Sequence, residues 1–309
     1  MTSTKNLVII LGPTGVGKTA TSLSLAGYFH SPIISADSRQ MYADIPIGTA
    51  APTAQELDSV KHYFIGNLGL DQYYSAARYE AEAIALITEL FKEHDVLLVT
   101  GGSMMYIDAL CYGIDDIPTI TPEVRQAIME QYRELGLEAM SEILRQKDPE
   151  YYRIVDRKNP KRVLHALEVC SMTGGTYTSL RKRTDAKRPF NIIKIGLTIP
   201  REELYMRIGQ RVDDMIADGL VEEARKVLPY RGCNSLNTVG YKELFSWFDG
   251  ELMPDGQKWT LEFAIDKIKR STRIYSRKQM TWFKRDRSIS WFAPSDTDAI
   301  IAHIQSRLN

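Results

Sequence analysis

A short glycine-rich stretch, GPTGVGKT at residues 12–19, has the residue types and the spacing of a phosphate-binding loop. Gly12, Gly15 and Gly17 permit backbone conformations that turn consecutive N–H groups toward an anion. Lys18 supplies a positive charge, and Thr19 supplies a hydroxyl suited to a Mg²⁺ ion that bridges phosphate oxygens. The stretch predicts a site for a diphosphate or a triphosphate, formed by Gly12, Pro13, Thr14, Gly15, Val16, Gly17, Lys18 and Thr19.

The segments around this loop predict an α/β fold, with a P-loop NTPase-like parallel sheet core flanked by helices. The expected elements are strands at 5–11, 32–37 and 96–102 and helices at 19–29 and 75–94. Apolar strands that alternate with helices form a parallel sheet, and ligands lie at the carboxyl ends of its strands. We therefore expect Asp37 and the segment Gly101-Gly102-Ser103 beside the phosphate loop.

The middle of the chain predicts an inserted all-helical domain. Apolar strand patterns disappear there, and helical patterns follow N-terminal signals such as Thr121-Pro122 and Asn159-Pro160. Helices are expected at 122–135, 137–146 and 161–172, and a strand at 191–199 resumes the core. The predicted organisation is a first part of the core at 1–119, the helical insertion at 120–188 and the rest of the core at 189–309.

The overall composition is that of an ordinary globular protein without net charge. The chain has 309 residues, with 39 Lys and Arg against 39 Asp and Glu. Its 3 cysteines are widely spaced, which is typical of a reducing compartment and not of a disulfide scaffold. No apolar stretch approaches the length of a membrane span, so we expect a cytoplasmic protein without a membrane partner.

One segment, residues 267–287, departs from this neutral balance because it is rich in Lys and Arg and contains Tyr275, Trp282 and Phe283. Such a segment is either a solvated helix face or an RNA-binding surface, and the mixture of cations with aromatic rings favours RNA. A helix over 261–282 would place on one side Ile265, Ile268, Thr272, Tyr275 and Gln279.

Three further features bear on the chemistry. The expected strand at 96–102 ends in Thr-Gly-Gly-Ser, where a typical nucleoside triphosphatase carries an acid that helps to hold Mg²⁺. This argues against hydrolysis and leaves a departing diphosphate as an alternative ligand. Asp37 is either the cap of a turn or a catalytic acid. Arg207 and Arg211 share a helix face; we interpret Arg207 as structural and Arg211 as a diphosphate ligand, with a solvated basic stripe as the alternative.

Taken together, these segments resemble the tRNA dimethylallyltransferase family, also called tRNA isopentenyltransferases. The resemblance spans nearly the whole chain, and its acidic and its basic, aromatic segments are more specific than the phosphate loop. Its motifs are GPTGVGKT (12–19), D-S-x-Q-x-Y (37–42), D-I-x-I-G-T-A (44–50), Y-S-A (74–76), G-G-S-M-x-Y (101–106), R-x-x-x-A-L-E-V (162–169), R-I-x-x-R-V-D-x-M (207–215), V-G-Y-K-E (239–243) and T-R-x-Y-x-[RK]-[RK]-Q-x-T-W-F (272–283).

The resemblance implies transfer of a dimethylallyl group from dimethylallyl diphosphate to N6 of the adenine next to the anticodon of tRNA, on its 3′ side. It implies that Asp37 accepts a hydrogen bond or proton from N6, and that Thr19 and Arg211 flank the reacting diphosphate. Lys18 and the loop N–H groups would stabilise the charge that accumulates on it. Mg²⁺ is the expected cofactor and Thr19 its expected ligand.

An adenine inside a stacked anticodon loop must be extruded before it can enter a buried site. The expected contacts with the anticodon stem-loop are Asp37, Ser38, Arg39, Gln40, Ser103, Arg125, Lys161, Arg162, Val163, Leu164, His165, Asn237, Thr238, Val239, Gly240, Tyr241, Lys242, Arg273, Arg277, Lys278 and Gln279. We expect a monomer. A P-loop small-molecule or nucleoside kinase, and an RNA-binding regulatory module that only switches conformation, remain alternatives.

Overall fold

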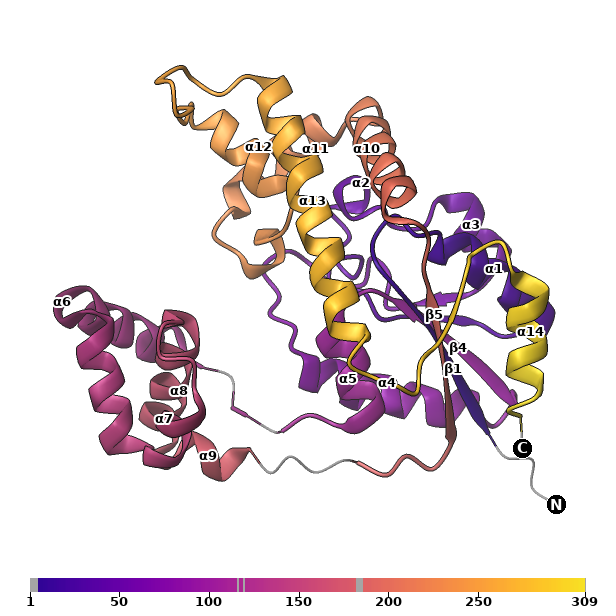
Figure 1. Ribbon diagram of the computed structural model, residues 1–309, viewed down its shortest axis with the longest axis horizontal. Coiled ribbons are helices and arrows are strands. Elements are labelled where there is room, and N and C mark those ends of the chain that lie inside the picture. Colours follow the sequence, from indigo (N-terminus) through magenta and orange to yellow (C-terminus); the bar gives the residue numbers. More distant parts are fainter. Residues whose placement is uncertain (1–4, 116, 119, 182–185, 309) are drawn as a thin grey trace. The chain divides into compact units, whose positions relative to one another are not determined.

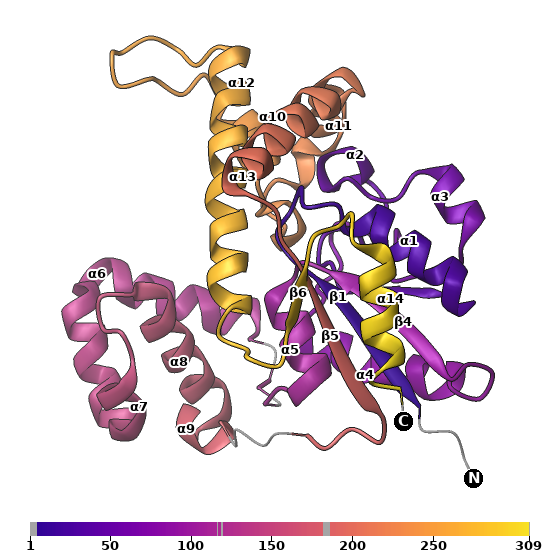
Figure 2. The same ribbon diagram turned by 45° about the vertical axis from the view of Figure 1, so that its right-hand side comes forward.

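The structure, a computed structural model shown in Figures 1 and 2, describes residues 5–115, 117–118, 120–181 and 186–308. The chain divides into two compact units, the first made of Met1–Cys111 with Lys187–Asn309 and the second of Tyr112–Ala186. The first unit contains a 6-stranded sheet whose neighbouring strands are all parallel, in the order β3-β2-β4-β1-β5-β6. Its strands are β1 (Asn6–Leu11), β2 (Ile33–Ser35), β3 (His62–Tyr63), β4 (Val96–Gly101), β5 (Asn191–Leu197) and β6 (Ser290–Phe292). The predicted α/β fold with a P-loop-like parallel sheet is confirmed.

β1 is a central strand because its sequence suits burial on both faces. Leu7, Val8, Ile9 and Ile10 are all 0% exposed. Successive side chains of a strand point to opposite faces, so Leu7 and Ile9 belong to one apolar cluster and Val8 and Ile10 to the other. A parallel strand covered on both faces requires such a continuous apolar run.

Helices cover both faces of the sheet (Figures 1 and 2). α1 (Lys18–Phe29) and α14 (Thr297–Gln305) pack in the cluster that contains Val8. α4 (Ala76–Leu90) and α5 (Met104–Tyr112) pack in the opposite cluster, which contains Leu7. The sheet is therefore the middle layer of a sandwich of helices.

A group of helices lies beyond the carboxyl ends of β1, β4 and β5 (Figure 1). Its long members are α10 (Arg201–Ala217), α11 (Leu220–Val227), α12 (Tyr241–Phe248) and α13 (Leu261–Phe283). Short elements complete this end of the unit: α2 (Pro46–Thr49), α3 (Ala54–Ser59) and 3-10 turns at Leu228–Tyr230 and Asn234–Leu236. α13 packs against both α10 and α12, and Trp282 near its end donates to Asp108 of α5 at 2.8 Å, which joins this group to the rest of the unit.

The structure departs from the predicted elements mainly at their ends. The helix predicted at 261–282 is Leu261–Phe283, and the strand predicted at 191–199 is Asn191–Leu197. The strand predicted at 32–37 is only Ile33–Ser35, because the chain turns after Ala36 and leaves Asp37 in a loop at the sheet end. The edge strands β3 and β6 are 2 and 3 residues long and were not predicted, since such short strands carry no periodic pattern.

In the described residues of the second unit, Tyr112–Ala186, the only regular elements are helices. Its helices are α6 (Pro122–Lys147), α7 (Pro149–Ile154), α8 (Pro160–Thr173) and α9 (Tyr177–Leu180). Gly136, at φ 77°, breaks α6 into two halves, which correspond to the helices predicted at 122–135 and 137–146. The unit has an apolar cluster of its own, with Met140, Leu144 and Val163 each 0% exposed.

Candidate active site

The phosphate loop leaves the carboxyl end of β1 and ends where α1 begins at Lys18. Gly15 and Gly17 have φ values of 82° and 109°, a region that side-chain-bearing residues rarely adopt. The Lys18 ammonium donates to Gly12 O at 3.0 Å and to Pro13 O at 2.9 Å. The pKa of Lys18 is lowered to about 8, first by burial and then by the Arg211 charge, while the Asp37 charge acts in the opposite direction. The loop therefore contains a half-buried cation whose charged form is less favoured than that of a lysine in water.

Two further strand ends meet the loop, as the parallel sheet requires. Ala36, just after β2, donates its N–H to Thr100 O in β4 at 2.7 Å. Ser103 Oγ, just after β4, accepts from Ser38 N at 2.8 Å and donates to Ser38 Oγ at 3.1 Å. Gly101 leaves room for this approach, because a Cβ there would lie 2.2 Å from Ala36 O. These contacts fix the loop in which Asp37 lies.

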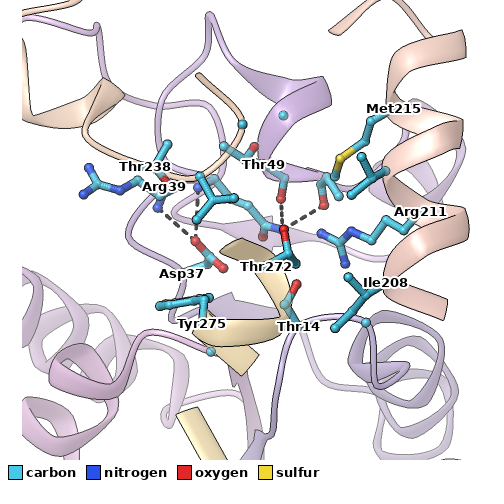
Figure 3. Close-up of a pocket in the computed structure, with 18 of the residues that line it drawn as sticks. Thr14, Asp37, Arg39, Thr49, Ile208, Arg211, Met215, Thr238, Thr272 and Tyr275 are labelled. Carbon is cyan, nitrogen blue, oxygen red and sulfur yellow. Dashed lines mark hydrogen bonds between the residues drawn. The ribbon is translucent and has the colours of Figure 1, made fainter. Parts of the chain in front are cut away.

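Asp37 uses one carboxylate oxygen in its own turn and presents the other to the pocket. Its Oδ1 accepts from Arg39 N at 2.9 Å and, at 3.4 Å, from Gln40 N. Within the described ranges no residue donates a hydrogen bond to Oδ2. Figure 3 shows the carboxylate, the Tyr275 ring and the Arg211 guanidinium directed into one pocket. Asp37 thus caps a turn and also offers a free acceptor to a ligand.

Arg211 reaches the same pocket from α10. Burial lowers the pKa of its guanidinium, and the Asp37 carboxylate acts in the opposite direction. Arg207, one turn earlier, also lines the pocket, although sequence analysis interpreted it as structural. It donates to Val16 O at 3.4 Å and pairs with Glu203 at 2.7 Å. The phosphate loop is therefore flanked by two arginines of one helix.

The pocket has a volume of about 560 Å³ and combines charged with apolar walls. The phosphate loop and Arg211 form its cationic part. α10 and α11 add apolar side chains at helical spacing: Ile208, Val212, Met215 and Leu220. α13 closes another side with Ile268, Thr272, Tyr275 and Gln279. Such a pocket can accept a molecule with an anionic head and a small apolar group.

The predicted tRNA contacts of the first unit fall into two groups. Those that line the pocket are Asp37, Ser38, Arg39, Gln40, Ser103, Asn237, Thr238, Val239, Gly240, Lys242 and Gln279. Arg277 and Lys278 are exposed on α13, and the half-buried Arg273 stacks on the Tyr205 ring at 5.6 Å. Tyr241 is 0% exposed, so its side chain is part of the core.

The remaining predicted contacts lie in the second unit. Arg125, Lys161 and Arg162 are exposed. Val163 and Leu164 face the apolar cluster of this unit and are 0% and 6% exposed. The other member of the set, His165, is half-buried, and its Nδ1 lies 3.4 Å from Glu168 Oε2. Lys161 and Arg162 therefore offer charge at the surface, whereas the two apolar side chains hold the helix in place.

Sequence reasoning missed Glu223, a carboxylate of α11 that fixes one wall of the pocket. Its oxygens accept from Ile47 N and Gly48 N at 2.8 Å each and from the Tyr241 hydroxyl. A Cβ at Gly48 would lie 2.3 Å from Tyr241 Oη, which explains the glycine. Glu223 thereby joins α2, α11 and the start of α12. Its neighbour Glu222 is exposed, so only the apolar periodicity of α11 could have suggested that Glu223 points inward.

The chain is similar to known proteins over nearly its whole length. A family model described as IPP transferase matches residues 40–286. A protein named tRNA dimethylallyltransferase 1 from Phocaeicola vulgatus is 61% identical over 300 residues, which cover 97% of this chain and 98% of the relative. Its namesake from Bacteroides thetaiotaomicron is 59% identical over 299 residues, which cover 97% and 95%.

Solved structures are similar over the same length. The crystal structure of the full-length tRNA isopentenylpyrophosphate transferase of Bacillus halodurans superposes with a TM-score of 0.71 at 34% identity, covering 98% of this chain and 97% of that one. A eukaryotic dimethylallyltransferase described as acting on tRNA shares the fold, with a TM-score of 0.78 at 23% identity, covering 98% and 77%.

The parallel sheet, the phosphate loop and the mixed pocket define a P-loop-type α/β transferase, whose site suits a diphosphate attached to an apolar group. The chain belongs to the IPP transferase family. The family expected from the motifs is confirmed, and the comparisons give no support to the kinase alternative.

Proposed function

We propose that this pocket transfers a dimethylallyl group from dimethylallyl diphosphate to N6 of the adenine that follows the anticodon of tRNA on its 3′ side, and releases diphosphate. The observation that carries the proposal is the presence of Lys18, Asp37 and Arg211 in one pocket of a family member. The cations suit the leaving group, and the carboxylate suits the nucleophile.

The bond changes assign a task to each of these groups. The N6 lone pair attacks C1 of the donor, the C1–O bond breaks, and its electron pair leaves on the diphosphate. Asp37, whose Oδ2 is a free acceptor, takes a hydrogen bond and then the proton from N6. Lys18, the loop N–H groups and Arg211 stabilise the negative charge that grows on the diphosphate. Both cations are half-buried, which strengthens this interaction, since water screens it less than at the surface.

The polynucleotide must deliver an extruded base to this pocket. Ser38, Arg39 and Gln40 line it beside Asp37, where base edges would be read. Outside the pocket, Arg277 and Lys278 on α13 and Lys161 and Arg162 on the second unit are exposed cations suited to the phosphates of an anticodon stem-loop. The remaining predicted contacts with tRNA, other than Gln279, stand as part of this proposal.

We further propose that the enzyme is a monomer and that it uses Mg²⁺. Among the described residues no group of three or more His, Cys, Asp or Glu is arranged to hold a metal, whereas the Thr19 hydroxyl lines the pocket. Mg²⁺ commonly binds through few protein oxygens together with substrate phosphates. Thr19 and the diphosphate would hold it, and the ion would neutralise phosphate charge.

None of the described helices is long and apolar enough to cross a membrane.

The test is to mix the protein and Mg²⁺ with labelled dimethylallyl diphosphate and an unmodified tRNA. Label should move onto the tRNA, and nuclease digestion should locate it on the adenine next to the anticodon. Parallel reactions should contain a transcript with that adenine replaced by guanine, which should stay unlabelled. ATP consumption without labelled RNA would instead favour a kinase, and RNA binding without either reaction would favour a regulatory module.

A further inference from the structure

Gln279 on α13 is a buried polar side chain that joins two strand ends of the site. It is 2% exposed, and both ends of its amide are used. Its Oε1 accepts from Thr14 N in the phosphate loop at 2.9 Å, and its Nε2 donates to Gly102 O after β4, also at 2.9 Å. Buried amides with both ends satisfied hold their partners in one arrangement, because breaking either bond leaves an unpaired polar group.

The peptide unit between Pro13 and Thr14 is held from both sides. Its carbonyl, Pro13 O, accepts from the Lys18 ammonium at 2.9 Å, and its N–H, on Thr14, donates to Gln279. A peptide unit is planar, so its N–H and C=O directions are fixed relative to each other. Gln279 therefore sets the direction of the carbonyl that positions Lys18.

The contact has little room for adjustment. A Cβ at Gly102 would lie 2.4 Å from the Gln279 amide nitrogen, so the side chain packs directly on the backbone.

Two exposed cations, Arg277 and Lys278, precede Gln279 in the same helix and point away from the core. α13 thus offers charge to solvent with one face and holds the phosphate loop with the other.

We propose that Gln279 is a positioning residue for the diphosphate loop and does not bind the RNA, although its place in the basic segment favoured an RNA contact. This inference rests on the proposed function, because it assumes that the loop holds the diphosphate. Gln279 keeps the Pro13–Thr14 peptide in the orientation that places the Lys18 ammonium at the mouth of the loop. Loss of this restraint impairs the binding of diphosphate and leaves the binding of RNA unchanged.

The experiment compares the wild type with Gln279→Glu and Gln279→Leu. Glutamate keeps the shape and the acceptor but loses the donor to Gly102 and adds negative charge beside the loop; leucine loses both bonds. Gln257→Glu, on an exposed residue outside the pocket lining, is the charge-matched control. Calorimetry with inorganic diphosphate and Mg²⁺, and filter binding with an anticodon stem-loop RNA, give the two affinities. Circular dichroism melting shows that each variant is folded.

Both Gln279 variants should bind diphosphate about tenfold or more weakly and raise the KM for dimethylallyl diphosphate, while RNA affinity stays within about twofold of the wild type. The control should match the wild type in diphosphate affinity, in the KM for dimethylallyl diphosphate and in RNA affinity. Unchanged diphosphate affinity together with weakened RNA binding would overturn the inference and restore the RNA-contact role. A wild type that fails to bind inorganic diphosphate would overturn the proposed function as well. If leucine alone fails to fold, the glutamate variant decides.

Discussion

The low pKa of Lys18 predicts how diphosphate binding depends on pH. Burial and the Arg211 charge lower this pKa to about 8 in the ligand-free protein. A bound diphosphate places negative charge beside the ammonium and raises the pKa again. Above pH 8, Lys18 has lost its proton in the free protein and must take one up when the ligand binds. Affinity for diphosphate should therefore fall as pH rises through 8 and should change little below it.

The size of the effect follows from the proton equilibrium. Each pH unit above the free-state pKa should weaken binding about tenfold, because one pKa unit corresponds to a tenfold change in an equilibrium constant. With a pKa of about 8, the dissociation constant should increase about tenfold between pH 7 and pH 9. For an unperturbed lysine, which titrates near 10.5, the same interval should produce almost no change.

Calorimetric titration with inorganic diphosphate at a series of pH values measures this dependence. Diphosphate itself titrates in this range, so Lys18→Arg is the matched control: arginine remains protonated throughout, and the ionisation of the ligand affects both proteins equally. The ratio of the two dissociation constants should change about tenfold between pH 7 and pH 9. A ratio that stays constant would show that Lys18 is already fully charged in the free protein and would refute the argument.

Three further predictions concern the rest of the site. Asp37→Asn should abolish prenyl transfer in single-turnover assays while the affinity for tRNA changes little, because the amide cannot accept the N6 proton; equal losses in both would contradict its catalytic role. Arg277→Ala should weaken tRNA binding and reduce the slope of log affinity against log salt concentration by about one, as measured by filter binding, whereas an unchanged slope would place this side chain away from the phosphates. Tyr241→Phe should lower the free energy of unfolding by about 1–3 kcal/mol, because the Glu223 carboxylate loses a buried donor; urea denaturation measures this, and an unchanged midpoint would show that the hydroxyl contributes nothing.

The sequence predicted best what depends on neighbouring residues. The apolar run of β1, the glycines of the loop and the start of α1 are contiguous, and each local feature has a direct conformational meaning. The convergence of strand ends followed from a rule of parallel sheets and is seen in the bonds from Ala36 to Thr100 and from Ser103 to Ala36. The sequence could therefore predict at which end of the sheet the pocket lies without any knowledge of tertiary contacts.

Contacts between distant segments could not be predicted in the same way. Glu223 and the amides of α2 that it accepts from are 176 and 175 residues apart in the chain. In the sequence it is one of two adjacent glutamates, and the apolar periodicity of α11 could suggest which of them points inward but not which groups it contacts. The same applies to Lys18: a cation in a phosphate loop is predictable, but its lowered pKa depends on its burial in the fold and on the charge of Arg211, which is distant in the chain.

In α13, the sequence predicts which side chains share a face but not what that face contacts. Helical periodicity placed Ile265, Ile268, Thr272, Tyr275 and Gln279 on one side. The last four line the pocket, whereas Ile265 packs against the apolar core. Periodicity gives the face but not what the face contacts, so the surrounding lysines and arginines suggested RNA for Gln279. The bond from Thr14 N, 265 residues away in the chain, points instead to the phosphate loop. A polar residue on the apolar side of a basic helix should therefore be tested for contacts with the core before its neighbours' charges are used to assign its role.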